Sequence, residues 1–571
     1  MLSYRKLAMR VLGRPLHTGG NDSPRPASQR AAAFILTAAM LTTLAAPAFA
    51  KTWHIEDGDI TVKAGDTKGT NKVSQGESTD VPDTDTVITN REKNASSHTV
   101  TIETNDKNDK VEVTLKDVNI DTSSRKEAAV SVTGEGDTNI KLDGDNALKS
   151  DIYRSGIYGS GSLTISGGEN DSLTAQGGSG ANGISSSGSL TISGGTVTAN
   201  GDDGGRGISS SGSVTISGGS TVTANGGNGT ISGGDGICSN GGVTISGGST
   251  VTANGGNGGR LVGGDGIRSS GGVTISGGST VTANGGNGGS LVGGDGIRSG
   301  GGLTVSDGTV TAKGGNGDSK DGYGGDGIRS GGVVTISGNT VNAAGGYGGK
   351  VGGYGICSFD RVAISGGTVE AAGGNGSTGG GSGIYSSVID LSGSLELTAK
   401  AGSPNGKALL QAGHELDLDT IKDKLDPGAK VTVTDADGKV NQVSIPRPVE
   451  PEEPVIPEES SSSSDGGSAT PSTPASPLPG LTVTDKSGAV ISYTSTQSGN
   501  TLTVCVGRFT ASFRISLAAL RPLRAEGIET ITFQTILCST TLSVDELLAM
   551  GGEDAEAVLT HRLTDSSLTV G

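Results

Sequence analysis

The sequence predicts an all-β protein whose main body is a three-sided, right-handed parallel β-helix, followed by a small α+β domain. A Gly-Ile step recurs along residues 156–384 with gaps of 24 to 31 residues. Each repeat also holds two short segments in which apolar and hydroxyl residues alternate, the pattern of a strand buried on one face. Glycine supplies 103 of the 571 residues and aromatic residues only 3%, which favours stacked coils with small side chains over a bulky globular core.

Each repeat is expected to form three short strands separated by glycine-rich corners. The first strand begins at the recurring isoleucine, the second resembles residues 190–193, and the third resembles residues 196–199. Because these patterns return in register, each strand should pair in parallel with its counterparts in the neighbouring coils. Two inward ladders are expected, one of isoleucines (Ile165, Ile192, Ile216, Ile245, Ile275) and one of valines (Val197, Val222, Val251, Val281, Val310).

Changes in composition divide the chain into six predicted segments. They are a signal peptide (1–50), an N-terminal cap with irregular first coils (51–150), the glycine-rich β-helix (151–412), a closing cap (413–445), a linker rich in Pro, Glu and Ser (446–480), and the small C-terminal domain (481–571). Trp53 lies in the segment expected to start the stack. In the C-terminal domain, the capping-box pattern from Ser543 to Glu546 predicts the start of a helix.

The first 50 residues have the features of a secretory signal. A basic region precedes an apolar run over residues 31–46, and small residues then lead to a predicted cleavage between Ala50 and Lys51. The alternative is an uncleaved membrane anchor, although the run is shorter than the ~20 residues that a spanning helix needs. The sequence therefore predicts a secreted or cell-surface protein without a membrane span after signal removal, and we expect a monomer.

The charge of the chain restricts its partners. The formal net charge is −17, and the first 50 residues contribute six basic side chains against Asp22, so the mature chain would carry about −22. A strongly acidic protein is not expected to bind nucleic acid or anionic lipid. Cations are the expected counter-partners.

The four cysteines are too few to form a disulfide framework for a chain of this length. Cys238 and Cys357 occupy the same repeat position four coils apart, roughly 19 Å at a strand spacing of ~4.8 Å, which is too far for a bond. Cys505 and Cys538 lie in the C-terminal domain, where they either form a disulfide in an oxidising compartment or stay buried thiols.

Aspartates recur at the corner that precedes the Gly-Ile step, at Asp235, Asp265, Asp295 and Asp326. Carboxylates stacked ~4.8 Å apart repel one another, so a counter-charge is expected. Three alternatives stay open. The ladder could bind Ca²⁺ at exposed turns, it could pair with the arginines three residues later (Arg268, Arg298, Arg329), or it could be solvated.

Aromatic side chains are the usual contact surface for sugar rings. Five of the few aromatic residues concentrate in the last coils: Tyr323, Tyr347, Tyr354, Phe359 and Tyr385. The four tyrosines are the predicted glycan contacts. The alternative is that these rings shield the end of the aspartate ladder.

Two further sets of polar residues recur from coil to coil. The third strand carries Thr-x-Thr pairs on its outer face (Thr196/Thr198, Thr221/Thr223, Thr250/Thr252, Thr280/Thr282, Thr309/Thr311), a grid that resembles the surfaces of β-helical ice-binding proteins but also suits any exposed strand. Asparagines recur in Gly-Gly-Asn-Gly turns (Asn228, Asn257, Asn287, Asn316), where we expect them to hydrogen-bond along the stack.

The repeats carry little that would support catalysis. No histidine lies between His98 and His414, and no acidic cluster resembles that of β-helix glycoside hydrolases. The sequence therefore predicts no catalytic residue. A polysaccharide lyase using arginine with calcium is the enzymatic alternative.

Several motifs resemble a known family. They are residues 53–55 and 58–60 (WHI and GDI), residues 113–115 and 118–120 (VTL and VNI), and the repeated TISGGTVTA. Over residues 53–412 the chain resembles bacterial carbohydrate-binding domain-containing β-helix proteins, which Gram-positive, often gut-dwelling, bacteria export. The resemblance implies binding of plant-type polysaccharides and calcium, but no binding residue of the family can be matched to a position here.

Together these features predict a non-catalytic, extracellular protein that binds carbohydrate or acts as an adhesin, with a plant or host glycan as partner and Ca²⁺ as the one expected cofactor. A structural surface stalk without a ligand is the first alternative. A calcium-dependent polysaccharide lyase is the second.

Overall fold

The computed structural model describes residues 50–318, 320–446, 480–485, 489–491, 493–498, 500–506, 510–535, 539–552, 555–561 and 566–570. The chain divides into two compact units, a β-solenoid and a small C-terminal domain, which are described separately. Of the predicted signal peptide only Ala50 is described, and of the predicted linker only Pro446 and Gly480; the rest of both segments lies outside the described residues.

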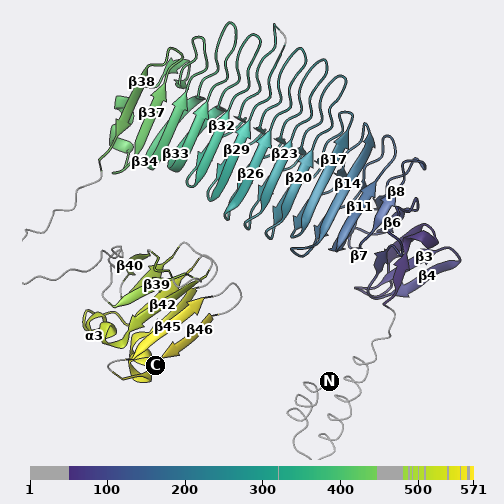
Figure 1. Ribbon diagram of the computed structural model, residues 1–571, viewed down its shortest axis with the longest axis horizontal. Helices are drawn as coiled ribbons and strands as arrows, with labels where there is room; N and C mark the ends of the chain where they lie inside the picture. The colour runs from purple at the N-terminus through teal and green to yellow at the C-terminus, as the bar shows by residue number, and fades with distance from the viewer. Residues whose placement is uncertain are drawn as a thin grey trace, which may run out of the picture. The chain divides into compact units, whose positions relative to one another are not determined.

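The predicted parallel β-helix is confirmed as a β-solenoid of about 14 turns with three strands in each regular coil (Figure 1). Each strand pairs in parallel with the strand one coil before and one coil after it. The pairing is residue for residue: Ile208 lies beside Ile237, which lies beside Ile267. The repeat period in the sequence is thus the coil of the structure.

The strands of the solenoid form three ladders. The first ladder consists of β2 (Ile60–Ala64), β6 (Val100–Glu103), β9 (Val130–Thr133), β12 (Ile157–Gly159), β15 (Ile184–Ser186), β18 (Ile208–Ser210), β21 (Ile237–Ser239), β24 (Ile267–Ser269), β27 (Ile297–Ser299), β30 (Ile328–Ser330) and β35 (Leu409–Gln411). The second consists of β1 (Thr52–His54), β5 (Val87–Thr89), β7 (Lys110–Lys116), β10 (Asp137–Asp143), β13 (Leu163–Ser166), β16 (Leu190–Ser193), β19 (Val214–Ser217), β22 (Val243–Ile245), β25 (Val273–Ile275), β28 (Leu303–Val305) and β31 (Val334–Ile336). The third consists of β8 (Asn119–Asp121), β11 (Asp145–Lys149), β14 (Ser172–Ser179), β17 (Thr196–Asp202), β20 (Thr221–Asn225), β23 (Thr250–Asn254), β26 (Ser279–Asn284), β29 (Gly308–Lys313), β32 (Thr340–Ala344) and β37 (Lys430–Thr434).

Two long strands, β33 (Ile356–Ala372) and β34 (Ile384–Lys400), each supply all three strands of one coil. The core inside the ladders is one continuous apolar column. The predicted isoleucine and valine ladders are confirmed, because no member has more than 1% of its surface exposed. A single coil could not bury these faces, so neighbouring coils stabilise one another.

Glycine-rich corners between the third and first strands make up a second stacked layer. Gly264 donates its N–H to Gly256 of its own coil and accepts the N–H of Gly286 from the next. A Cβ atom on Gly264 would lie 1.9 Å from the carbonyl oxygen of Gly234. The backbones therefore pack at a distance that only glycine permits, which explains the glycine content.

Both ends of the solenoid are capped. At the N-terminal end, β2, β3 (Asn71–Gln75) and β4 (Ser78–Asp83) form an antiparallel meander. Trp53 is buried beside it, and its indole N–H donates to the Asp83 carboxylate at 2.7 Å. At the other end, β36 (His414–Glu415), a 3₁₀ helix (Leu418–Lys424), β37 and β38 (Val440–Ser444) cover the last coil.

The described residues of the C-terminal domain form two four-stranded sheets and two helices. One sheet has the order β39 (Leu481–Thr484), β42 (Ala511–Ser516), β45 (Glu556–His561), β46 (Ser566–Val570), and the other β40 (Thr494–Ser498), β41 (Thr501–Cys505), β43 (Thr530–Gln534), β44 (Ser539–Ser543). The helices are α3 (Leu517–Ala525) and α4 (Val544–Met550). Ser543 caps α4 by accepting the N–H of Glu546, as predicted.

Candidate functional site

The outer surface of the first ladder carries a single row of side chains, one from each coil, that we call the outward row. Each member follows the buried residue that opens its strand and therefore points away from the core. In order along the solenoid from β6 to β34 the row reads Thr101, Ser131, Tyr158, Ser185, Ser209, Cys238, Arg268, Arg298, Arg329, Cys357 and Tyr385. Hydroxyl and aromatic groups dominate its first part, and arginines its second.

A groove of about 510 Å³ lies over the first part of this row. It is lined by Thr99, Thr101, Lys126, Glu127, Ala128, Ser131, Tyr153, Arg154, Ser155, Tyr158 and Ser185. We call it the tyrosine groove. Two exposed aromatic rings thus stand beside two cations, a carboxylate and several hydroxyl groups, the mixture that binds sugar rings and their hydroxyls.

The tyrosines of the groove are strongly exposed, Tyr153 by 78% and Tyr158 by 43%. Tyr153 has a φ of +60°, a conformation that is uncommon for a bulky residue. Its N–H donates to the Ser179 carbonyl at 2.9 Å, and its ring lies against Gly180, where a Cβ would come within 3.0 Å of it. The corner holds the ring at the surface rather than burying it.

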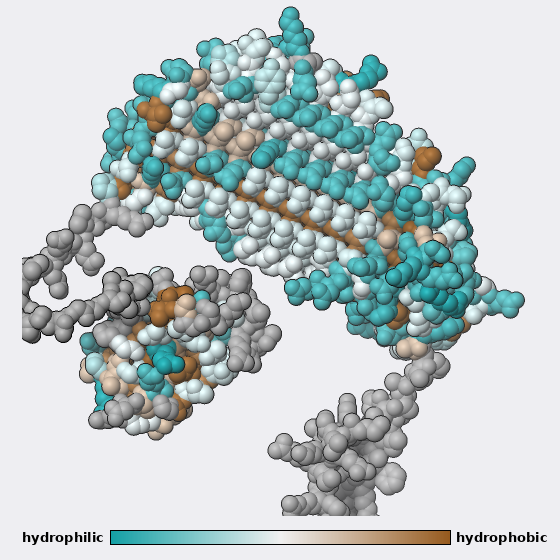
Figure 2. Space-filling view, viewed as in Figure 1, coloured by the Kyte–Doolittle hydropathy of each residue, from teal (hydrophilic) through white to brown (hydrophobic). Residues whose placement is uncertain are grey.

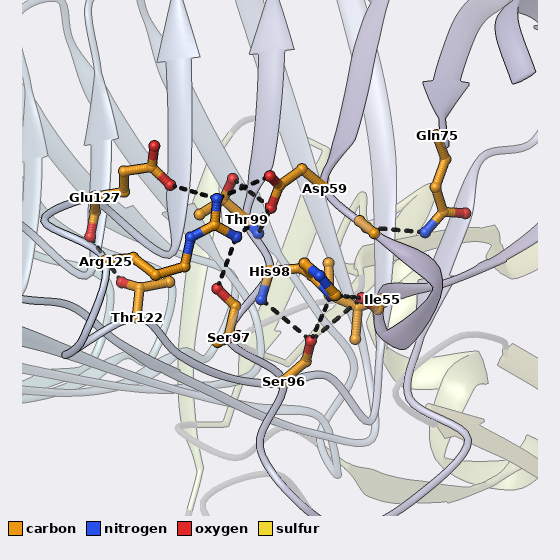
Figure 3. Close-up of polar contacts among 11 residues, drawn as sticks. Ile55, Asp59, Gln75, Ser96, Ser97, His98, Thr99, Thr122, Arg125 and Glu127 are labelled. Atoms are coloured by element: carbon orange, nitrogen blue, oxygen red, sulfur yellow. Dashed lines mark hydrogen bonds and ion pairs between the residues drawn. The ribbon is translucent and has the colours of Figure 1, made fainter. Parts of the chain in front are cut away.

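Arg125 ties the groove to the N-terminal cap (Figure 3). Its guanidinium donates to both carboxylate oxygens of Asp59, at 2.7 and 2.9 Å, and lies 3.1 Å from the Glu127 carboxylate. Asp59 also accepts the N–H of Thr99 at 2.8 Å. Hydrogen bonding from Arg125 is the main cause that holds the pKa of Asp59 below its usual value. The network orients Glu127 at the groove.

We expect Arg125→Ala to lower the free energy of unfolding at neutral pH by no more than about 1 kcal/mol, because solvent screens this half-exposed pair. A carboxyl with a lowered pKa stabilises the fold above its unfolded pKa and loses that effect as pH falls, so the difference should vanish in acid. Thermal unfolding at neutral and acid pH measures this. Lys110→Ala removes an exposed ion pair with Asp137, in which the charged atoms are 3.9 Å apart, and should change the free energy of unfolding little at either pH. An equal loss of stability in both variants would contradict the stabilising role of the Arg125–Asp59 pair.

The aspartate ladder lies next to the arginine part of the outward row. All four carboxylates are buried, with 4 to 6% exposure. Each Oδ1 accepts the backbone N–H of the corresponding residue in the next coil: Asp265 donates to Asp235, Asp295 to Asp265, Asp326 to Asp295, and Tyr354 to Asp326, at 2.7 to 3.0 Å. The alternative of a solvated ladder is therefore wrong, because the carboxylates are buried and accept backbone N–H groups in place of water.

Burial is the main cause of raised pKa values along the ladder. It raises the pKa of Asp265 to about 8, of Asp295 to about 7 and of Asp326 to about 6. Neighbouring aspartates act in the same direction on Asp265 and Asp295. Near neutral pH the ladder therefore carries less negative charge than four fully ionised carboxylates would.

These shifts predict a pH-dependent stability. Between about pH 4 and pH 8 Asp265, Asp295 and Asp326 bind more protons in the folded chain than in the unfolded chain, so their contribution to the free energy of unfolding should fall as pH rises. Asp265→Asn keeps an oxygen for the N–H of Asp295 but removes the charge. At pH 8 it should stabilise the protein by at least about 1.4 kcal/mol, the worth of one pKa unit, and by much less near pH 4.5.

Thermal unfolding of Asp265→Asn at both pH values tests this, with the exposed Asp318→Asn as control. Equal destabilisation by Asp265→Asn at both pH values would show that the ladder acts only through its hydrogen bonds.

Pairing of the ladder with arginines is confirmed at two of the three predicted pairs. Arg329 lies 3.2 Å from Asp326 and Arg298 lies 3.9 Å from Asp295. Asp235 pairs instead with Arg206 of the preceding coil, at 3.1 Å. Among the described residues, Arg268 makes no ion pair.

The ladder fits a calcium ion poorly. Ca²⁺ takes six to eight accessible oxygens, whereas the carboxylates are buried, each Oδ1 already accepts an N–H, and guanidinium groups lie alongside. Within the described residues no group of three or more His, Cys, Asp or Glu side chains is placed to hold a metal ion. Calcium stays a prediction that a chelator tests.

The four predicted glycan-contact tyrosines differ in their surroundings. Tyr354 and Tyr385 stack with ring centroids 5.0 Å apart, and Tyr354 caps the aspartate ladder through its N–H. This is the shielding arrangement considered as the alternative. Tyr323 and Tyr347 lie on glycine corners with 42% and 47% exposure, and Lys350 lies 5.7 Å from the Tyr323 ring centre.

The threonine and asparagine rows lie where the sequence predicts them. The Thr-x-Thr pairs align residue for residue on the outer face of the third ladder, the face on which pale and teal rows run from coil to coil in Figure 2. The turn asparagines hydrogen-bond along the stack as expected: Asn257 donates its N–H to the Asn228 side chain, and Asn287 to that of Asn257.

Two of the cysteines are buried in the solenoid. Cys238 and Cys357 are buried free cysteines of the outward row, and burial raises their pKa values to about 11 and about 12. Cys505 is also free and lies 3.4 Å from the Gln534 side-chain oxygen, while Cys538 lies outside the described residues.

The fold and the groove define a class: a parallel β-solenoid with a polar, aromatic groove on one face. Comparison of the chain with protein-family models, with curated proteins and with solved structures finds no match. Within the described residues, the structure contains no helix of the length and apolarity that crossing a bilayer requires.

Proposed function

We propose that this chain is a non-catalytic, extracellular glycan-binding protein and that the tyrosine groove is its binding site. The observation that carries the proposal is the pair of exposed rings, Tyr153 and Tyr158, in a groove that also holds charged and hydroxyl side chains. Exposed aromatic rings stack on the apolar faces of pyranose rings, while Arg154, Lys126 and Glu127 supply donors and an acceptor for hydroxyl groups.

The setting of the groove supports a preformed site. Tyr158 is fixed on strand β12 between Ser131 and Ser185 of the neighbouring strands. Arg154 is held by a hydrogen bond from its Nε to the Lys126 carbonyl, at 3.1 Å. Groups on rigid strands and tied corners lose little conformational freedom on binding, which favours affinity for a weakly interacting ligand such as a sugar.

Retention of the full chain on insoluble plant, host and microbial polysaccharides tests the proposal, with calcium and again with chelator. We expect selective retention on at least one neutral polysaccharide. Loss of retention with chelator would show that calcium takes part in binding. Unchanged retention with chelator would show that calcium is not needed for binding. No retention under either condition would contradict the proposal and favour the structural stalk.

The same samples test the enzymatic alternative. A lyase releases unsaturated sugar products, which absorb in the ultraviolet, and the groove holds arginine, lysine and tyrosine side chains. We expect no such product. Its appearance would replace a binding function with a catalytic one.

A further inference from the structure

A second groove, separate from the tyrosine groove, follows the arginine part of the outward row. Its volume is about 690 Å³. Four guanidinium groups line it, those of Arg206, Arg268, Arg298 and Arg329, together with Asp235, Asp265, Asp295 and the backbone of the glycine corners. We call it the arginine groove.

The arginines stand in a regular row because the strands that carry them are in register. Arg268 of β24 lies beside Arg298 of β27, which lies beside Arg329 of β30. Neighbouring strands are ~4.8 Å apart, so like charges recur at about that spacing. Such a row is unfavourable unless anions lie against it.

The protein itself supplies only part of that negative charge. Arg329 has a close partner in Asp326 at 3.2 Å, Arg298 has a distant one in Asp295 at 3.9 Å, and among the described residues Arg268 has none. The carboxylate of Asp265, next to Arg268, is buried and accepts the N–H of Asp295. Arg268, the first arginine of the row, is therefore an exposed cation without an ion pair among the described residues.

We propose that the arginine groove binds a linear polyanionic polysaccharide along the solenoid axis, with Arg268 and Arg298 as the principal anion contacts. The guanidinium fork matches carboxylate and sulfate oxygens with paired hydrogen bonds. The regular spacing of the row suits a polymer that presents an anionic group at each repeat, and the glycine corners allow its backbone to approach closely.

The acidic charge of the rest of the chain does not prevent this binding. At physiological ionic strength the Debye length is about 8 Å, so distant surface carboxylates are largely screened. The groove arginines act at contact distance, where screening is weak. The proposal uses residues distinct from those of the tyrosine groove and does not rest on it.

Binding of the full chain to immobilised chondroitin sulfate and hyaluronate, at physiological ionic strength, tests the proposal, with neutral dextran and single-stranded DNA as further probes. We expect binding to at least one of the two polyanionic glycans; a preference between them identifies sulfate or carboxylate as the recognised group. Absence of binding to both would overturn the proposal, and equally tight binding of DNA would overturn the assignment to a polysaccharide.

Variants locate the site. Arg268→Gln removes a guanidinium group that makes no ion pair among the described residues, so the fold should be unaffected. The affinity for the polyanionic glycan should fall at least about tenfold. Arg268→Gln with Arg298→Gln should lower it further. Lys313→Gln with Lys400→Gln changes the net charge equally on a different face and should change affinity by less than about twofold.

Unchanged affinity in the arginine variants, or an equal loss in the lysine control, would overturn the proposal. Retention on neutral polysaccharide should be the same in all these variants, which separates a failure of this site from a failure of the tyrosine groove.

Discussion

Replacing Tyr153 and Tyr158 together by alanine should reduce glycan retention at least about a hundredfold while leaving the solenoid folded. Each exposed ring supplies a stacking face that alanine cannot replace, and aromatic contacts dominate the energy of small binding sites. Both side chains are exposed and lie outside the apolar core, so thermal unfolding should change little. Isotherms on the retained polysaccharide measure the effect.

The matched control is Tyr347→Ala with Tyr354→Ala, which removes two tyrosines from the last coils. The sequence predicts glycan contacts there, whereas the structure shows Tyr354 stacked on Tyr385 at the end of the aspartate ladder. We expect this control to keep affinity. A loss in the control but not in Tyr153→Ala/Tyr158→Ala would place the binding site in the last coils instead.

Substitution of Gly264 by alanine should destabilise the solenoid by more than about 2 kcal/mol. The added Cβ would lie 1.9 Å from the Gly234 carbonyl oxygen and 2.4 Å from its carbon, so backbone of two coils must move. The hydrogen bond that Gly264 donates to Gly256 and the one that it accepts from Gly286 would be lengthened as well. Urea-induced unfolding of the full chain, followed by circular dichroism, measures the loss.

Gly159→Ala is the control for this prediction. A Cβ atom added to Gly159 would have no neighbour closer than 3.8 Å, and the φ angle of Gly159 is not in the left-handed region. Its unfolding free energy should stay within roughly 1 kcal/mol of the parent chain. Similar behaviour of the two variants would show that the glycine layer does not hold the coils together.

The regular part of the fold could be predicted because it is encoded locally and repeatedly. Alternation with period two in segments such as β16 and β20 fixes which side chains face inward, and the repeat length fixes which strands pair. The asparagine rows follow from the same register. Each of these features needs only the sequences of neighbouring repeats and the assumption that coils stack.

Features that depend on how corners fold could not be predicted in this way. A Gly-Asp-Gly corner has the composition of an exposed turn, yet the glycine layer buries Asp265 and changes the chemistry of its carboxyl. The bond between Arg125 and Asp59 joins residues 66 positions apart in two irregular coils. No periodicity connects such residues.

The tyrosine groove was also missed, although the sequence held a signal for it. Two of only eight tyrosines, Tyr153 and Tyr158, lie within six residues of each other at a corner without the long glycine loop. The ring of Tyr158 is much larger than the side chains of Ser131 and Ser185 on either side of it and is 43% exposed.

A crystal structure of the chain with an oligosaccharide from the retained polysaccharide tests the central claim most directly. The account predicts a pyranose ring against Tyr153 or Tyr158, with its hydroxyl groups hydrogen-bonded to Arg154, Lys126 or Glu127. A sugar bound only elsewhere, on the threonine rows or among the tyrosines of the last coils, would contradict it.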